Sequence, residues 1–206
     1  MSARAEKRER EGGEKIESVE ERRKTGEELY RRYMAGDENS FEEIVAMYEN
    51  ELAHFIYGIV GDYHESKHLT IETFARLAVG GEKFGEKSSL KTYVFAIGKH
   101  LAVRHVKKRA NERHLSFEEA AGVFAGESES PYDMLEREEN RRLLHGAMEG
   151  LKENYRAVLL LLYFEDMSYI QAGEIMNKSE RQIRDLAYRA KAALKKKLES
   201  EGFTYG

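Results

Sequence analysis

Apolar residues recur at steps of three and four along most of this chain, and this spacing limits the possible fold more than any other feature. An α-helix turns about 100° per residue, so the spacing places the apolar side chains on one helix face. One Pro and no Trp, with abundant Ala, Leu, Glu, Lys and Arg, also favour helices over strands. We therefore predict an all-α fold. The longest stripe consists of Phe41, Ile44, Val45, Tyr48, Leu52, Phe55, Ile56 and Ile59.

Breaks in this pattern divide the chain into two small helical domains, which the length of 206 residues allows. Residues 1–26 are charged and almost without apolar side chains, so we expect a disordered tail. We predict the first domain over residues 27–109 and the second over 131–200. Glycines and acidic residues predict a flexible acidic linker over 110–130, and 201–206 form a short tail.

Charge is distributed unevenly, although 34 Lys and Arg against 38 Asp and Glu give a net charge of only -4. Five cations and no acid lie from Lys99 to Arg109, and eight cations against two acids lie from Lys178 to Lys197. Residues 111–140 hold nine acids against two cations. Because phosphate contacts need cations, the two basic segments are the candidates for nucleic-acid binding.

Several classes of protein are disfavoured by what the sequence lacks. Without Cys there is no disulfide framework, thiolate metal site or cysteine nucleophile. No run of 18 apolar residues and no signal-peptide-like start is present, so we expect a cytoplasmic protein that does not insert into membranes. His64 and His68 have the spacing of metal ligands, but exposed or hydrogen-bonded histidines are far commoner. With no catalytic motif either, we predict no enzyme activity, no cofactor and no metal.

Four capping patterns mark expected helix starts. In each, a Ser or Asp side chain accepts a hydrogen bond from a backbone amide that the first helical turn leaves unpaired. Two lie in the first domain, at Ser40–Glu43 and Asp62–Glu65, and two in the second, at Ser168–Gln171 and Ser179–Gln182. A helix of about two turns and a tight turn separate the second pair. A short helix, a tight turn and a long basic helix form a helix-turn-helix pattern.

The long basic helix keeps its apolar residues on one side, so its charged residues project away from the core. A solvated charged face is the alternative, which the preceding short capped helix disfavours. We expect Arg184 and Tyr188 to point outward and read bases, with Arg189 and Lys191 nearer the flanks holding phosphate. The residues predicted to face DNA are Ser179, Arg181, Gln182, Arg184, Asp185, Tyr188, Arg189 and Lys191.

Four stretches of the chain follow the pattern of a known family. They are LYRRYMAGDENSFEEIVAMYENELAHF (29–55), HLTIETFARL (68–77), SLKTYVFAIGKHLAVRHVKKR (89–109) and YRAVLLLLYFEDMSYIQAGEIMNKSERQIRDLAYRAKAAL (155–194). In this order they resemble regions two and four of the extracytoplasmic-function sigma factors of bacterial RNA polymerase, in the sigma-70 family. Two ordered parts make the resemblance more specific than a helix-turn-helix alone.

The resemblance implies a sigma factor that binds core RNA polymerase and promoter DNA and directs promoter-specific transcription initiation. The first domain would hold the polymerase clamp and melt the minus-ten element, and the helix from Ser179 would dock on the minus-thirty-five element. An anti-sigma factor is a further partner the family allows. The implied polymerase contacts are His68, Thr70, Ile71, Glu72 and Phe74. The implied minus-ten contacts are Phe84, Tyr93, Lys99, His100, Arg104, Lys107, Lys108 and Arg109.

Among these residues, Phe84 and Tyr93 supply the aromatic surface that a flipped base needs. The chain departs from the family where His68 and Ile71 replace the usual Asp and Gln, and where His100 replaces the usual Asn. The alternative function is a stand-alone helix-turn-helix regulator, independent of core polymerase. Such a regulator would normally dimerise on a palindrome, and the first domain shows no dimerising heptad.

Overall fold

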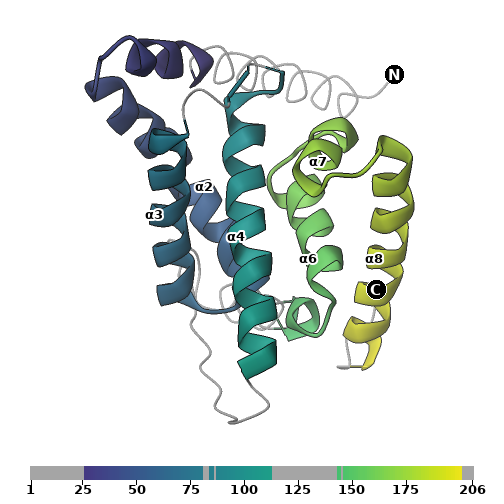
Figure 1. Ribbon diagram of the computed structural model, residues 1–206. Helices are drawn as coiled ribbons and strands as arrows, with labels where there is room; N and C mark the ends of the chain where they lie inside the picture. The colour runs from purple at the N-terminus through teal and green to yellow at the C-terminus, as the bar shows by residue number, and fades with distance from the viewer. Residues whose placement is uncertain (1–25, 81–83, 86, 113–142, 145, 201–206) are drawn as a thin grey trace, which may run out of the picture.

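The structure is a computed structural model that describes residues 26–80, 84–85, 87–112, 143–144 and 146–200. Every regular element within these residues is a helix, which confirms the all-α fold. In Figure 1, α2, α3 and α4 form one group, and α6, α7 and α8 form the other. The bounds are α2 Asn39–Val60, α3 Tyr63–Val79, α4 Leu90–Glu112, α6 Glu153–Leu159, α7 Tyr169–Met176 and α8 Glu180–Ser200.

The first domain is a bundle in which α2, α3 and α4 pack against one another. The predicted apolar stripe of α2 faces inward, and its Ile44, Leu52 and Ile59 are fully buried. Phe55 of α2 meets Phe95 of α4, with ring centroids 5.2 Å apart. Burial of apolar surface stabilises such a bundle by about 25 cal/mol per Å². The period of the sequence therefore decides which helix faces are left for solvent or partners.

Local hydrogen bonds determine where the helices of the first domain begin. Asp62 caps α3 as predicted, because its Oδ1 accepts the backbone amide three residues on at 3.1 Å. The predicted Ser40–Glu43 capping box is wrong: Ser40 already lies within α2, and its hydroxyl donates to Asp37 Oδ2 at 2.7 Å. The ionised Asp37, which Arg32 also binds, is a stronger partner for this hydroxyl than a backbone group.

The second domain packs α6 and α7 against α8. The apolar run over 158–164 does not form one continuous α-helix, because α6 ends at Leu159 and is followed by a π-helix, η3 (Leu160–Phe164). Its wider turn changes the direction of the last side chains, so Tyr163 and Phe164 are exposed while Leu161 is fully buried.

Helices extend past both predicted ends of the first domain. Gly26, placed in the tail, is helical and buried, within a helical stretch over residues 26–34. At the other end α4 continues to Glu112, three residues past the predicted boundary at 109. Most of the predicted linker lies outside the described residues.

The two domains pack against each other along α4 and α2. α4 contacts α7, and α2 contacts α6 and η3. The buried apolar side chains of both domains form one continuous cluster. α4 therefore has neighbours in both domains.

Close approach of α4 to α2 depends on Gly98. A Cβ added at this position would lie 2.8 Å from Leu52 Cδ1 and 3.3 Å from Ile56 Cδ1, and both of those side chains are fully buried. We predict that Gly98→Val lowers the free energy of unfolding by about 1–3 kcal/mol through overpacking, measured by chemical denaturation. Gly85→Ala is the control, because nothing lies within 4 Å of that position. Equal stability of the two variants would contradict the close packing of α4 on α2.

Candidate nucleic-acid interface

Reciprocal caps begin both helices of the helix-turn-helix, as predicted. The Ser168 Oγ accepts the Gln171 amide at 3.2 Å, and the Gln171 Oε1 accepts the Ser168 amide at 2.9 Å. The same exchange joins Ser179 and Gln182, at 3.3 and 2.9 Å. Each cap satisfies two backbone donors that the first turn of a helix leaves unpaired. The start of α8, where a recognition helix meets bases, is thereby fixed.

The turn between α7 and α8 is tight because two residues permit it. Asn177 ends α7 in the left-handed conformation at φ 53°, which Asn tolerates better than most residues. Gly173 lies against the turn, and a Cβ there would be 2.6 Å from the Lys178 carbonyl oxygen. The sequence pattern of short helix, turn and long helix is thus realised in the geometry.

α8 turns its apolar side chains to the core and leaves its polar face open. Ile183, Ala187 and Ala190 are buried, while Tyr188 is 78% exposed. All eight residues predicted to face DNA are exposed: Ser179, Arg181, Gln182, Arg184, Asp185, Tyr188, Arg189 and Lys191.

The Arg184 guanidinium is held by two neighbours although it is exposed. Its Cζ lies over the Tyr169 ring, 4.4 Å from the ring centroid. Its Nε and Nη2 both donate to Glu180 Oε1, at 3.1 and 2.5 Å. Arg184 therefore lies against α7 instead of pointing freely outward. Tyr169 was not singled out in the sequence, because its partner is fifteen residues away.

Lys191, on the same side of α8, also lies over a tyrosine ring. The Lys191 Nζ lies 4.5 Å from the centroid of the Tyr163 ring, which η3 contributes. A hydrogen bond with Tyr163 raises the pKa of Lys191, so its ammonium is charged at neutral pH. Arg189 differs, because its Nε donates to the Asp185 carbonyl at 3.2 Å.

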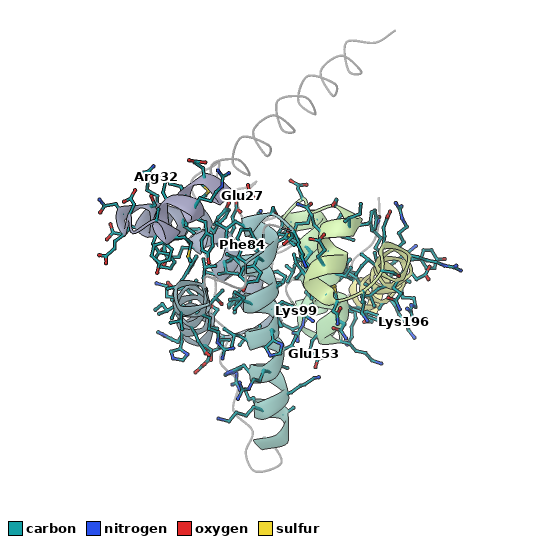
Figure 2. All side chains as sticks on the ribbon, turned by 45° about the horizontal axis from the view of Figure 1, so that its top comes forward. Glu27, Arg32, Phe84, Lys99, Glu153 and Lys196 are labelled. Atoms are coloured by element: carbon teal, nitrogen blue, oxygen red, sulfur yellow. The ribbon has the colours of Figure 1, made fainter. Side chains whose placement is uncertain are left out.

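The second candidate surface is the later half of α4. His100, Arg104, Lys107 and Lys108 are exposed, and Arg109 is partly buried, with Nη1 3.9 Å from Asp62 Oδ2. Lys99 is also partly buried and lies between α4 and the second domain in Figure 2.

Burial, reinforced by the positive charges of Lys178 and Lys107, lowers the pKa of Lys99. Most of the predicted basic segment is thus exposed on α4, although the packing of the second domain partly covers Lys99, its first cation.

The two aromatic residues predicted to receive a flipped base differ in position. Phe84 is buried, with its ring centroid 5.2 Å from Tyr30 and 5.2 Å from Tyr93. Because the rings of Tyr30 and Tyr93 cover Phe84 in this arrangement, its contact with a base stays a prediction. Tyr93 is only partly buried and is the outer member of the cluster. Phe84 thus supports Tyr93.

The residues predicted to bind polymerase lie on opposite faces of α3. His68, Ile71 and Glu72 face outward, and Ile71 is 67% exposed. Thr70 and Phe74 are buried and face the core of the first domain, so their contact with polymerase stays a prediction.

The helical period explains this division. Thr70 and Phe74 share the inner face with Leu69, and the Thr70 hydroxyl donates to a carbonyl of α3 itself. The same period places Val79, which was overlooked, on the outer face with Ile71, and Val79 is 91% exposed.

No group of three or more potential metal ligands occurs among the residues that the structure describes. His64 packs edge-on against Tyr63, and Glu65 pairs with His105 at 3.5 Å. Within the same residues, no helix is long and apolar enough to cross a membrane.

Known proteins match the chain in two parts. The model of Sigma-70 region 2 matches residues 44–112, and the model of Sigma-70, region 4 matches residues 141–194. The ECF RNA polymerase sigma factor SigM of Bacillus subtilis is 30% identical over 156 residues, which are 76% of this chain and 93% of SigM. SigW of the same organism is 25% identical over 79% of this chain and 91% of its own length.

Solved structures share the fold. The sigma factor RpoE of Bartonella quintana, in complex with the anti-sigma factor NepR, has a TM-score of 0.65 at 19% identity, over 77% of this chain and 96% of RpoE. CnrH, in complex with the cytosolic domain of CnrY, has a TM-score of 0.63 at 18% identity, over 85% and 98% of the two chains. Both sigma regions are matched in order, and SigM is matched along most of its length. The chain therefore belongs to the extracytoplasmic-function RNA polymerase sigma factors of the sigma-70 family.

Proposed function

We propose that this sigma factor binds core RNA polymerase through the outer face of α3 and promoter DNA through α4 and α8. The observation that carries the proposal is that α8 leaves every predicted DNA contact exposed at a helix start fixed by its caps. The protein selects promoters and has no catalysis of its own, acting in the cytoplasm with the polymerase. An anti-sigma factor is a further partner, by analogy with RpoE and its anti-sigma factor NepR.

The polymerase-binding surface is the stripe of His68, Ile71, Glu72 and Val79 on α3. Ile71 and Val79 are large apolar side chains exposed about two turns apart on one face of α3. Glu72 lies beside them and binds Arg76, with Oε1 2.7 Å from Nη2. An apolar strip with a charged rim has the composition of a protein–protein interface.

This surface is tested by pull-down of purified core polymerase with the full chain. We expect Glu72→Lys and Ile71→Asp each to weaken the complex by about tenfold or more, because each places a charge that the interface does not match. Glu43→Lys, exposed on α2, is the matched control and should bind as the native chain does. Binding of both α3 variants at native affinity would exclude this face, whereas failure of the native chain to bind at low salt would exclude the function.

Recognition of the minus-thirty-five element is assigned to the exposed face of α8. Glu180 accepts hydrogen bonds from the Nε–Nη2 edge of the Arg184 guanidinium. The donors at the end of the guanidinium remain, and they are the Nη1 group and the second hydrogen of Nη2. Two such donors match the O6 and N7 acceptors of guanine. Arg184 therefore reads a base, while Lys191, a point charge, holds phosphate.

Titration of a short duplex at several salt concentrations separates these roles. Arg184→Ala should cost about 1–3 kcal/mol on the preferred sequence and little on a scrambled one. Lys191→Ala should weaken binding to both sequences alike and reduce the salt slope by about one unit. If Arg184→Ala weakens both equally, Arg184 only contacts phosphate.

The Tyr169 ring orients Arg184 for this contact. Tyr169→Leu should lower discrimination between the two sequences, because the guanidinium loses the surface on which it lies. Tyr169→Phe keeps the ring and should retain discrimination. In the Arg184→Ala background, Tyr169→Leu should change discrimination no further. An equal loss in both backgrounds would show that Tyr169 does not act through Arg184.

The minus-ten element is assigned to the exposed cations of α4 and to Tyr93. Arg104 and Lys108 lie within about one turn of each other on the exposed side of α4, where cations contact the strand backbone, and the exposed His100 lies one turn before Arg104. Tyr93 provides a stacking surface for an unpaired base, supported from behind by Phe84. Clamp binding and base stacking would then use different helices of one domain, α3 and α4.

A further inference from the structure

The π-helix η3 places a tyrosine on the surface beside the basic face of α8. In η3 the Glu165 amide donates to the Leu160 carbonyl five residues earlier at 3.0 Å, so the turn is wider than that of an α-helix. The wider turn leaves Leu161 fully buried and Tyr163 46% exposed. Single π-turns inside α-helices are frequent at functional sites. Tyr163 is therefore a candidate for a role that packing of the core does not explain.

The side chain of Lys191 on α8 lies against this tyrosine. The Lys191 Nζ is 4.5 Å from the centroid of the Tyr163 ring and forms a hydrogen bond with Tyr163. An ammonium group has donors and no acceptor, so the Tyr163 oxygen is the acceptor in this bond. The hydroxyl hydrogen of Tyr163 and two of the ammonium hydrogens are not used in it. Donors from two elements, α8 and η3, thus lie side by side on the surface.

Lys191 differs from two neighbouring cations of α8 because no acid pairs with it. Arg184 donates to Glu180, and the Lys195 Nζ lies 3.7 Å from Glu199 Oε1. Within the part of the chain that the structure describes, Lys191 has no ion-pair partner, and the groups that raise its pKa are tyrosines alone. An exposed ammonium without a paired carboxylate attracts an incoming anion more strongly than a cation that is already paired.

Lys191 also lies where α8 would meet the DNA backbone. Seven residues separate it from Arg184, so the two side chains lie on the same face of α8, about 10 Å apart along the helix axis. The start of a recognition helix reaches base edges, and residues further along the helix meet the backbone. The ligand expected beside Lys191 is therefore a phosphate and not a base.

A phosphate oxygen fits both donors of this surface. The ammonium supplies the charge, and the hydroxyl supplies a directional hydrogen bond, which is shorter and stronger to an ionised oxygen than to a neutral one. A lysine alone acts as a point charge and accepts a phosphate in many positions. Two donors on different elements restrict the phosphate to one position.

We propose that the Tyr163 hydroxyl and the Lys191 ammonium form a two-point site for one backbone phosphate of the minus-thirty-five element, so that the DNA contact continues from α8 onto η3. The proposal rests on the proposed function for the placement of DNA on α8, and it adds Tyr163 as a direct contact. Because phosphate contacts fix the register of a protein on the duplex, this site determines where along the element Arg184 reads.

Uncharged methylphosphonates, placed at one phosphate at a time, locate the site in a duplex of the preferred sequence. Tyr163→Phe removes only the hydroxyl, and we expect it to weaken binding of the full chain to the unmodified duplex by about threefold to tenfold. At one phosphate position, the loss of affinity on replacement should be smaller in Tyr163→Phe and in Lys191→Ala than in the native chain. In the double variant, replacement at that position should cost nothing further.

The salt dependence of binding separates a direct contact from a merely structural role. Lys191→Ala removes a charge and should reduce the salt slope by about one unit, whereas Tyr163→Phe removes no charge and should leave the slope unchanged. If Tyr163 only held Lys191 in place, its variant would lower the slope as well. Tyr155→Phe, the same change on α6, is the matched control and should bind as the native chain does.

Three results would overturn the proposal: native affinity of Tyr163→Phe, a lowered salt slope in that variant, or effects of the two variants at different phosphates. If the native chain still prefers the minus-thirty-five sequence in these cases, the proposed function stands and only the role of Tyr163 is wrong. Equal binding of the native chain to the preferred and scrambled duplexes would instead overturn the proposed function of α8 and this proposal with it.

Discussion

Burial of one apolar stripe per helix is the constraint on which the rest of this structure depends. In α2, α3 and α8 the stripe is committed to the core, so the opposite face is free to carry polar or interacting residues. Ile71 is exposed because Thr70 and Phe74 are not, and Tyr188 is exposed because Ile183 and Ala187 are buried. The surfaces assigned to polymerase and promoter are thus a consequence of how the core is packed.

Local features explain why much of this was predictable from the sequence. Helical periodicity identified α2 and α8, and three of four capping patterns formed as expected, including both around the helix-turn-helix. The fourth failed at Ser40 because Asp37, brought close by a turn and held by Arg32, competes for the hydroxyl. Thr70 and Phe74 are a different case, because their contact with polymerase stays a prediction although both side chains are buried. Those residues followed from the family resemblance, although the period of α3 could already have assigned them to the core.

Contacts between residues far apart in the chain could not be predicted from the sequence. Nothing in the chain indicates that Phe84 lies between Tyr30 and Tyr93, or that Arg184 lies on Tyr169, because these pairs depend on how helices are placed in space. The same holds for Lys91 and Glu165, whose meeting requires both domains to fold and dock. These long-range contacts decide whether a predicted functional residue is free, supported or covered.

Transcription in vitro, with mapping of RNA 5′ ends, tests the central claim most directly. Core polymerase is supplied with fragmented genomic DNA, with and without the purified chain. The account predicts RNA ends that occur only when the chain is present. Each of these ends is preceded by the same pair of sequence elements, about 10 and 35 base pairs upstream, which are separated by about two and a half helical turns. The same RNA ends with and without the chain, or new ends that share no such pair of elements, would contradict it.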